Sequence, residues 1–392
     1  MSDGHAEERC GTPRRLPWGG VRRLGLAVTA ALLVLAATAN AAAPPVQAPA
    51  YVVQSTVDGR TLAARDASAP RAMASITKLM TVLVALERLS LDGEVLVTPA
   101  AARVGESSLD LRAGQRVPVR DLVIGALVPS ANDAATALAI GAGGSVAAFV
   151  AAMNRKAQEL GLVHTRYRNP HGLDEPGHVS SAADSAVLLR AALRIPAIGR
   201  YAGAPRATLS DGRVVDSTDN LVGRLPGFVG GKTGHTALAG WSQVGFARSA
   251  GVGITAAVLG SPTEAQRDRD LAALLRFGLS SYRRSRVVDA GRTYARVEVG
   301  WGRPALPLVA PRTVVRPAPT GRPLVERVVA PVVAALPVRA GQRLGTVVVR
   351  DGGRVVARSP LVAARAEAAP TLAQKARWVA GRAIDRLGGL VS

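Results

Sequence analysis

The spacing of apolar residues changes once along the chain, and this change limits the folds that the chain can adopt. Between residues 75 and 280 apolar residues recur mostly at helical spacing, as at Leu79, Leu83 and Leu86. Between residues 292 and 359 short β-branched runs are broken by Pro and Gly, and Asp351-Gly352-Gly353 is typical of a hairpin turn. The pattern predicts a helix-rich α/β domain over 51–283, followed by a small all-β domain over 284–368.

Within the first domain the pattern is clear enough to predict individual elements. Apolar residues on either side of Asp58-Gly59 indicate a hairpin over 51–64. Helical periodicity and glycine-bounded apolar runs predict the remaining elements. We expect helices over 75–89, 119–127, 133–140, 146–160, 182–193 and 263–279, and strands over 241–247 and 253–259.

The N-terminal segment has the pattern of an export signal. Arg14, Arg15, Arg22 and Arg23 precede an apolar stretch that is short for a membrane span, and Ala39-Asn40-Ala41 offers small residues for cleavage. We therefore expect a signal peptide over 1–41 and a Pro/Ala linker over 42–50, with an uncleaved anchor as the alternative.

The C-terminal segment, 371–392, returns to helical periodicity. Its apolar residues recur every three or four positions among basic ones, which predicts an amphipathic helix that lies on a membrane surface. The alternative is a helix packed on the β domain, because the apolar face is mostly alanine. The apolar residues are Leu372, Ala376, Val379, Ala383, Leu387 and Leu390, and the basic ones are Lys375, Arg377, Arg382 and Arg386.

Composition excludes several classes of protein. At 48% hydrophobic residues the chain is not mostly disordered, and a single long apolar run excludes a polytopic membrane protein. The formal net charge of +21 suggests anionic partners, but the arginines are scattered and no nucleic-acid-binding motif is present. We therefore expect no nucleic acid partner. Outside the cytoplasm such a charge would favour anionic lipid or anionic wall polymer.

Lysine is rare among the basic residues, and two of the four lysines lie in short motifs with hydroxyl residues. Ser75-Ile76-Thr77-Lys78 places a hydroxyl and an amine three residues apart, on one face of a helix. A neutral lysine can activate a serine, whereas arginine does not lose its proton in proteins. The alternatives for this motif are a solvated helix face or an N-cap serine.

Two further motifs follow in the sequence. Ser130-Ala131-Asn132 lies between two helical stretches; it offers a second hydroxyl and an amide, or else a polar turn with an N-cap. Lys232-Thr233-Gly234 precedes the predicted strand pair and offers a cation and a hydroxyl to a carboxylate. It is not a phosphate-binding P-loop, because that motif requires glycine where Pro226 stands.

The ordered set, with 55 and 102 residues between the motif starts, resembles the Ser-x-x-Lys, Ser-x-Asn, Lys-Thr-Gly set of penicillin-recognising serine enzymes. The chain resembles in particular the D-alanyl-D-alanine carboxypeptidases, the low-molecular-mass penicillin-binding proteins, from about Tyr51 to the C-terminus. The stretches that carry this resemblance are 74–78, 107–111, 169–174 and 231–236.

The resemblance implies a fold and an activity. It implies a penicillin-binding/β-lactamase-like transpeptidase domain, with helices around an antiparallel sheet, then a β-rich domain and an amphipathic helix. The implied enzyme lies on the outer face of the cytoplasmic membrane. It cleaves the terminal D-alanine from peptidoglycan stem peptides without a cofactor, and β-lactams acylate it.

The resemblance also assigns roles to residues. Ser75 would be the nucleophile, Lys78 its base and Ser130 a proton relay to the leaving D-alanine. Asn132 would hold the substrate amide. Substrate binding is completed by Lys232 and Thr233 at the carboxylate, Gly234 beside them, His235 with Ser75 in the oxyanion hole, and Arg267 near the site. The residues before Arg267 depart from the family pattern.

Other functions remain open in the sequence. His164, His171 and His178 lie at sevenfold spacing, but they lack the Cys or carboxylate partners of a zinc site, so we expect no metal. Asp174 and Glu175 lie where a class A β-lactamase keeps its deacylating glutamate, so that enzyme is an alternative. A D,D-endopeptidase is another. A wall-binding relative without activity is disfavoured by the three intact motifs.

Overall fold

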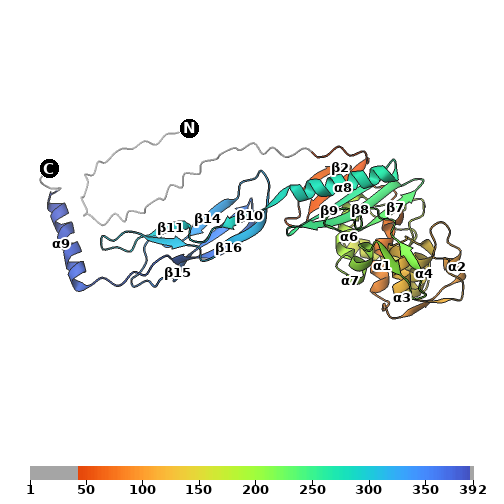
Figure 1. The fold of residues 1–392 in the computed structure, drawn as a ribbon, viewed down its shortest axis with the longest axis horizontal. Coiled ribbons are helices and arrows are strands. Elements are labelled where there is room, and N and C mark those ends of the chain that lie inside the picture. The colour runs from red at the N-terminus through yellow and green to blue at the C-terminus, as the bar shows by residue number, and fades with distance from the viewer. Residues whose placement is uncertain (1–42, 389–392) are drawn as a thin grey trace, which may run out of the picture. The chain divides into compact units, whose positions relative to one another are not determined.

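The computed structural model describes residues 43–388 of the chain, and side chains up to residue 383. The predicted signal peptide lies outside the described residues. The N-terminal part of this region forms a mixed α/β domain around a five-stranded sheet, and the C-terminal part forms a β domain and one helix (Figure 1).

The central sheet is antiparallel, in the order β2-β1-β9-β8-β7. The predicted hairpin is confirmed: β1 and β2 pair with one another, and β1 then pairs with β9. The strand bounds are β1 Ala50–Ser55, β2 Thr61–Arg65, β7 Phe228–Thr236, β8 Gly240–Ser249 and β9 Val252–Ser261.

Both faces of this sheet are covered by helices. Successive side chains of a strand point to opposite faces, so one strand contributes residues to two separate cores. In β9, Ile254 and Val258 pack into the same core as Leu271 of α8 (Glu264–Ser280), whereas Leu259 packs into the other core. That second core is formed by α6 (Ala182–Ala192), α1 (Thr77–Leu86) and the helices beyond them. Figure 1 shows α8 along one side of the sheet and α6 and α1 on the other.

The helices over residues 119–202 confirm most of the predicted periodicity. The predicted ranges match α3, α4, α5 and α6 to within a few residues at each end. Sequence patterns did not indicate α2, α7 or two short ladders, β3–β4 and β5–β6, because they are short. The bounds are α2 Pro99–Ala102, α3 Val119–Leu127, α4 Asn132–Gly143, α5 Val146–Glu159, α7 Pro196–Ala202, β3 Glu94–Leu96, β4 Arg116–Pro118, β5 Arg206–Thr208 and β6 Val214–Asp216.

The C-terminal domain is all β, as the sequence indicated. Its five-stranded sheet has the order β11-β12-β16-β15-β14, beside a β10–β13 pair, and Gly352 lies in the turn between β15 and β16. The strands are β10 Tyr282–Val288, β11 Thr293–Val297, β12 Leu306–Val309, β13 Val314–Pro319, β14 Val325–Val329, β15 Arg343–Asp351 and β16 Arg354–Ala363.

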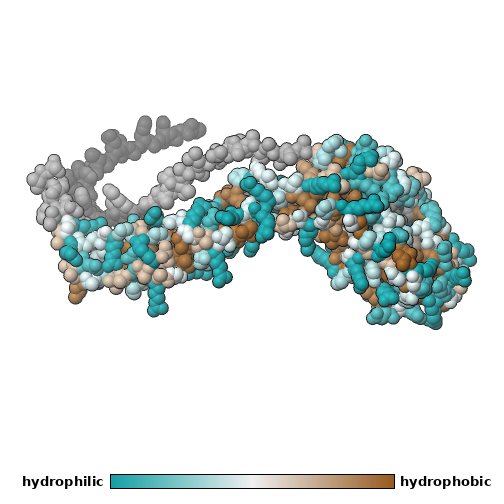
Figure 2. Space-filling model, in the orientation of Figure 1, coloured by the Kyte–Doolittle hydropathy of each residue, from teal (hydrophilic) through white to brown (hydrophobic). Residues whose placement is uncertain are grey.

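The segments at the two ends differ in their packing. In the segment expected to be a linker, Val46 and Ala48 are buried, and the backbone N–H of Ala48 donates to Asp270 of α8. The tail forms α9 (Leu372–Gly388), in which Leu372 is 84% exposed. Among residues 43–388 no single helix is long and apolar enough to cross a membrane. On the face shown in Figure 2, hydrophilic residues are spread over the surface and do not gather in one block.

Candidate active site

The first motif forms a tight turn at the start of the central helix. Ser75 lies in a 3₁₀ turn, Ala74–Ile76, that leads directly into α1. The preceding Ala74 has a φ of 48°, a left-handed conformation that strains a residue with a Cβ. The N-caps of the turn and the helix are Met73 and Ile76, and neither Ser75 nor another side chain makes a capping hydrogen bond there. The N-cap interpretation of Ser75 is therefore wrong.

Lys78 holds the centre of the site. Its Nζ lies 2.6 Å from Ser75 Oγ, 2.7 Å from Asn132 Oδ1 and 2.8 Å from the carbonyl oxygen of His171. The side chain is completely buried. Three oxygens from three separate segments thus fix one nitrogen next to the serine hydroxyl.

The surroundings of Lys78 favour its neutral form. Burial lowers the pKa of Lys78 well below its usual range, and the nearby positive charge of Lys232 lowers it further; Glu106 and Asp133 act in the opposite direction. A neutral amine has a lone pair, so it can accept the proton of the Ser75 hydroxyl. The helix thus places a proton acceptor at hydrogen-bond distance from a weak nucleophile.

A second hydroxyl–amine pair lies near enough for its charge to act on the first. Lys232 Nζ donates to Ser130 Oγ at 2.9 Å and to the carbonyl oxygen of the adjacent residue Thr233 at 3.0 Å. Ser130 has a φ of 67° and is 8% exposed, and the N-cap of α4 is Ala131. No side chain caps α4, so the interpretation of this motif as a turn with an N-cap is wrong.

The charged form of Lys232 is disfavoured as well. Burial lowers its pKa to about 7, the negative charge of Asp219 acts to raise the pKa, and the positive charge of Arg267 acts to lower it. A carboxylate placed beside this amine would favour the protonated form. The structure describes no acidic side chain within ion-pair distance of it.

A loop from residues 169–178 packs against the 3₁₀ turn that holds Ser75. Gly172 has a φ of 96°, and a Cβ added there would lie 2.1 Å from the carbonyl oxygen of Ala74. Asn169 Oδ1 accepts from the Gly172 N–H at 2.7 Å and so holds the turn. Only a residue without a side chain fits at this position.

His178 completes this packing as a neutral ring. Its Nδ1 accepts the backbone N–H of Arg168 at 3.0 Å, so its Nε2 carries the proton and donates to Thr77 Oγ1 at 2.8 Å. Thr77 in turn donates to the carbonyl oxygen of Ala74. Burial lowers the pKa of His178 to about 4, which agrees with a neutral ring.

The third motif lies within a strand, although the sequence placed it just before the strand pair. Residues 232–234 belong to β7, which pairs with β8. A Cβ at Gly234 would lie 2.9 Å from the backbone nitrogen of Ser75 and 3.0 Å from the carbonyl oxygen of Met73. The glycine therefore lets the strand backbone lie directly against the turn that holds Ser75.

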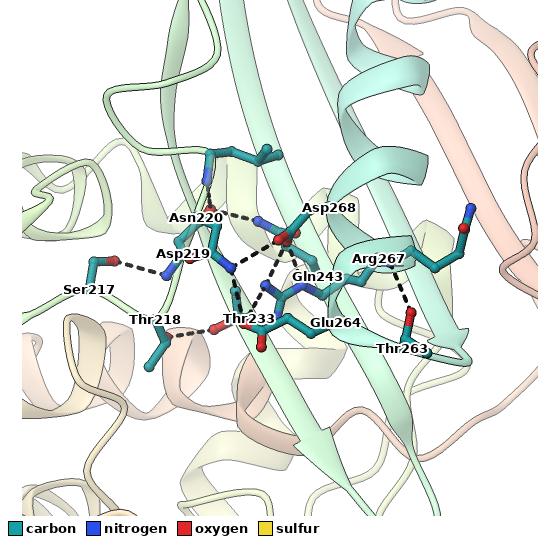
Figure 3. A network of polar contacts seen from close by, with 12 residues as sticks. Ser217, Thr218, Asp219, Asn220, Thr233, Gln243, Thr263, Glu264, Arg267 and Asp268 are labelled. Atoms are coloured by element: carbon teal, nitrogen blue, oxygen red, sulfur yellow. Dashed lines mark hydrogen bonds and ion pairs between the residues drawn. The ribbon is translucent and has the colours of Figure 1, made fainter.

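A polar network behind this strand was not predicted from the sequence (Figure 3). Thr218 and Thr233 share a hydrogen bond of 2.6 Å between their hydroxyls. Asp219 Oδ1 accepts from Gln243 Nε2 at 2.7 Å, and Gln243 lies opposite Thr233 in the β7–β8 ladder. The buried Asp219 carboxylate has a raised pKa because of its burial. The network links the 217–221 segment to the strand that carries Lys232.

Arg267 lies at the edge of the same network. Its side chain is 2% exposed, and its guanidinium binds Asp268 at 2.6 Å and Glu264 at 3.3 Å. It also lies over the ring of Trp241, which stacks on His235 with 4.1 Å between centroids. His235 itself is exposed. Arg267 thus reaches the site through its charge and through the Trp241–His235 stack.

The residues that suggested other activities make ordinary structural contacts. Asp174 accepts from the Thr236 hydroxyl and the Leu238 N–H, and Glu175 accepts from Asn169. His171 Nδ1 accepts the N–H of Leu173. Over the described part of the chain, no three His, Cys, Asp or Glu residues gather as metal ligands would.

The sequence matches one protein family. Residues 37–263 fit the family described as Peptidase_S11, D-alanyl-D-alanine carboxypeptidase. The chain is 30% identical to the D-alanyl-D-alanine carboxypeptidase DacF of Bacillus subtilis over 318 residues, which cover 78% of this chain and 82% of DacF. It is 36% identical to DacB2 of Mycobacterium tuberculosis over 213 residues, which cover 53% of this chain and 73% of DacB2.

Solved structures give the same result. Penicillin-binding protein 5 from Haemophilus influenzae superimposes with a TM-score of 0.62 at 27% identity and covers 84% of this chain and 99% of its own. The Streptomyces K15 DD-transpeptidase superimposes with a TM-score of 0.57 at 26% identity over 61% of this chain and 99% of its own. The fold class expected from the sequence is confirmed.

Proposed function

The chain belongs to the D-alanyl-D-alanine carboxypeptidase family, and from this premise we propose that it removes the terminal D-alanine of peptidoglycan stem pentapeptides through an ester at Ser75. The observation that carries the proposal is the position of the buried Lys78 amine, 2.6 Å from the Ser75 hydroxyl. The enzyme is a serine-type hydrolase.

In the first step the Ser75 hydroxyl attacks the carbonyl carbon of the penultimate D-alanine. Lys78 takes the hydroxyl proton as the C–O bond forms, and the carbonyl becomes an oxyanion. The backbone N–H groups of Ser75 and His235 are the donors that we assign to this oxyanion. The close approach of Gly234 to the Ser75 nitrogen supports the assignment, because it brings the backbone of β7 next to the backbone of the turn that holds Ser75.

In the second step the C–N bond breaks and D-alanine leaves. Its amine needs a proton. Ser130 gives its hydroxyl proton to the amine and takes in return the proton that Lys78 removed from Ser75, so Lys78 is neutral again; Lys232 Nζ, 2.9 Å from Ser130 Oγ, holds that hydroxyl in place. Water then attacks the Ser75 ester with Lys78 again as base, which frees the shortened peptide and the serine.

Substrate recognition is assigned to the remaining motif residues. Lys232 and Thr233 would bind the terminal carboxylate, with Gly234 leaving room for the substrate backbone and Arg267 adding positive charge. Asn132 would hold the substrate amide; its Oδ1 already accepts from Lys78, so its Nδ2 is the group that can bind a substrate carbonyl. That Nδ2 now donates to the carbonyl oxygen of Gly105 at 3.0 Å.

Covalent labelling with fluorescent penicillin tests the nucleophile. A β-lactam presents a strained amide and a carboxylate to the same groups, so we expect one slowly released adduct on Ser75, located by mass spectrometry of the peptides. Ser75→Ala should abolish labelling, whereas Ser108→Ala should retain it. Rapid turnover of penicillin would instead favour the β-lactamase alternative, and absence of label on the folded chain would exclude the proposed site.

Release of D-alanine distinguishes the related peptidase activities. Incubation with a pentapeptide that ends in D-alanyl-D-alanine should release free D-alanine, whereas a D,D-endopeptidase would cleave cross-linked dimers faster. Transfer of the acyl group to an added amine would indicate a transpeptidase, the activity named for the Streptomyces K15 structure.

We further propose that the enzyme acts outside the cytoplasm and that α9 attaches it to the membrane surface. In the described part of α9, Leu372 is 84% and Val379 57% exposed, so these apolar side chains are largely uncovered. Trp378 is half-buried, and its ring meets Trp301 edge-on at 5.2 Å. Arginine and lysine beside exposed apolar residues suit an anionic bilayer surface.

A further inference from the structure

Three arginines line a cavity that belongs to none of the motifs. The cavity has a volume of about 590 Å³ and lies where the end of β1, the end of α6 and the start of β7 meet β8. Arg190 reaches it from the last turn of α6, Arg194 from the turn that follows α6, and Arg248 from the end of β8. We call it the arginine cavity.

The positive charge of the arginine cavity is not balanced by its own walls. Its described lining contains no Asp or Glu, and none of the three guanidinium groups forms an ion pair with a described residue. Asp58 precedes the lining residue Gly59, and both of its carboxylate oxygens accept a hydrogen bond from the hydroxyl of Tyr282. Like charges four residues apart repel one another, so an anion between them would be stabilised.

Arg190 is already fixed in place for such a ligand. It is half-buried, and its Nη1 donates to Gln54 Oε1 at 2.5 Å, a neutral acceptor. Burial, and then the charge of Arg194, lowers the pKa of Arg190. The other two arginines are exposed and can close on a ligand without losing an existing ion pair. A guanidinium presents a planar fork of donors that suits phosphate oxygens.

The rest of the lining is partly apolar and partly made of the polar residues Gln54, Ser55 and Thr56. Leu193, Val229 and Phe246 form walls, and the hydroxyl of Thr56 is held by the carbonyl oxygen of Gly253. Such walls would bury a hydrocarbon group next to the charged head. The volume is within the range of small-molecule pockets in proteins.

The arginine cavity is distinct from the catalytic site but shares a strand with it. Val229 lines the cavity, and Lys232 lies three residues further along β7, a path of about 10 Å at the usual rise of a strand. None of the catalytic or substrate-binding motif residues lines the cavity.

We propose that the arginine cavity binds a phosphate ester with a short apolar arm. Three cations favour a doubly charged phosphate head over a singly charged carboxylate, and the apolar walls favour an ester over inorganic phosphate. Binding needs no reaction at Ser75 and therefore stands or falls independently of the proposed function.

Calorimetric titration of the whole protein with butyl phosphate tests the proposal. We expect saturable binding that is stronger than that of inorganic phosphate or pentanoate, none for butanol, and weakening at high salt. Arg194→Gln should weaken binding by about tenfold, as the loss of one charge-assisted hydrogen bond does. Arg276→Gln, an exposed arginine on α8, is the matched control and should leave it unchanged.

Any of four outcomes would overturn the proposal. The first three are absence of saturable binding, equal affinity in Arg194→Gln and Arg276→Gln, and loss of butyl phosphate binding after penicillin has acylated Ser75, which would place the phosphate in the catalytic site. Because Arg190 is partly buried and its replacement can disturb folding, Arg248→Gln serves as the second variant, with the same tenfold loss expected. Stronger binding of inorganic phosphate than of butyl phosphate would exclude the apolar arm.

Discussion

The Nζ of Lys232 lies 2.9 Å from the Oγ of Ser130, so the site contains a second hydroxyl–amine pair besides that of Ser75 and Lys78. The first pair, Ser75 with Lys78, comes from one helix, and the second joins a loop to a strand 102 residues away. The two amines are both buried, and the charge of Lys232 disfavours a charge on Lys78. The positive charge of Lys232 thus favours a neutral Lys78, and the two lysines have separate tasks.

Replacement of each lysine by arginine should distinguish these tasks. Lys78→Arg cannot accept the Ser75 proton, so we expect penicillin acylation to fall by at least ~10²–10⁴-fold. Lys232→Arg keeps a cation near the substrate carboxylate, so acylation should remain measurable while substrate binding weakens. Time courses of penicillin labelling measure both, with circular dichroism to check folding. Equal rates in the two variants would mean that Lys78 is not the base.

The pH dependence of acylation should have a falling alkaline limb set by Lys232. Its pKa is about 7 in the free enzyme, so the cation is lost, and kcat/KM should fall, as pH rises through that value. The negative charge of Asp219 acts to raise this pKa, so Asp219→Asn should move the limb to lower pH, by roughly half a unit or more.

Two variants check the origin of that shift. Arg267 acts to lower the pKa of Lys232, so Arg267→Gln should move the limb to higher pH. Asp211→Asn removes a carboxylate that is exposed and paired with Arg213, and it should leave the profile unchanged. If Asp219→Asn and Asp211→Asn give the same profile, Asp219 does not influence Lys232.

Replacement of Gly172 by alanine should disturb the nucleophile turn itself. The new Cβ would lie 2.1 Å from the carbonyl oxygen of Ala74, so the loop or the turn must move. We expect a loss of stability of about 2–4 kcal/mol in urea unfolding and a marked loss of acylation. Gly161→Ala is the matched control: its φ is 70° and nothing lies within 4 Å of the added Cβ, so only backbone strain of about 1–2 kcal/mol should remain. Similar effects of the two variants on acylation would exclude a role for the contact with Ala74.

Deletion of residues 371–392 should release the mature protein from the membrane, because the exposed apolar and basic residues of α9 are then absent. Fractionation of cells followed by penicillin labelling measures where the active protein lies. The deleted protein should still be labelled at Ser75. Retention in the membrane fraction would indicate that the N-terminal segment is uncleaved or that another surface binds the bilayer.

Local patterns were sufficient to predict most helices, the β1–β2 hairpin and the pairing of Ser75 with Lys78. In each of these the interacting residues are close in the sequence, so apolar periodicity or turn residues are enough to predict the contact. The contact of Asn132 with Lys78 joins distant residues, and there the resemblance to a family supplied the grouping. The hydrogen-bond partners and the burial of the motif residues come from distant segments, so they could be known only from the structure.

The network around Asp219 could not be predicted in this way. Its hydrogen bonds to Gln243 and the contact of Thr218 with Thr233 join side chains whose sequence spacing has no period. The same holds for the three-residue strands β3 to β6, which are too short to show alternation. Asp174 and Glu175 suggested a catalytic carboxylate, but only their hydrogen-bond partners reveal a structural role.

Gly172 and Gly234 contact the two sides of the turn that holds Ser75, and they come from segments far from it in the sequence. A chain in which either segment has not yet folded lacks one of the two walls that position the serine. Reactivity toward penicillin should therefore arise only once the whole α/β domain has closed. During unfolding, loss of labelling by freshly added penicillin should therefore report detachment of the loop or of β7, and comparison with the loss of helical circular dichroism shows whether it precedes melting of the helices.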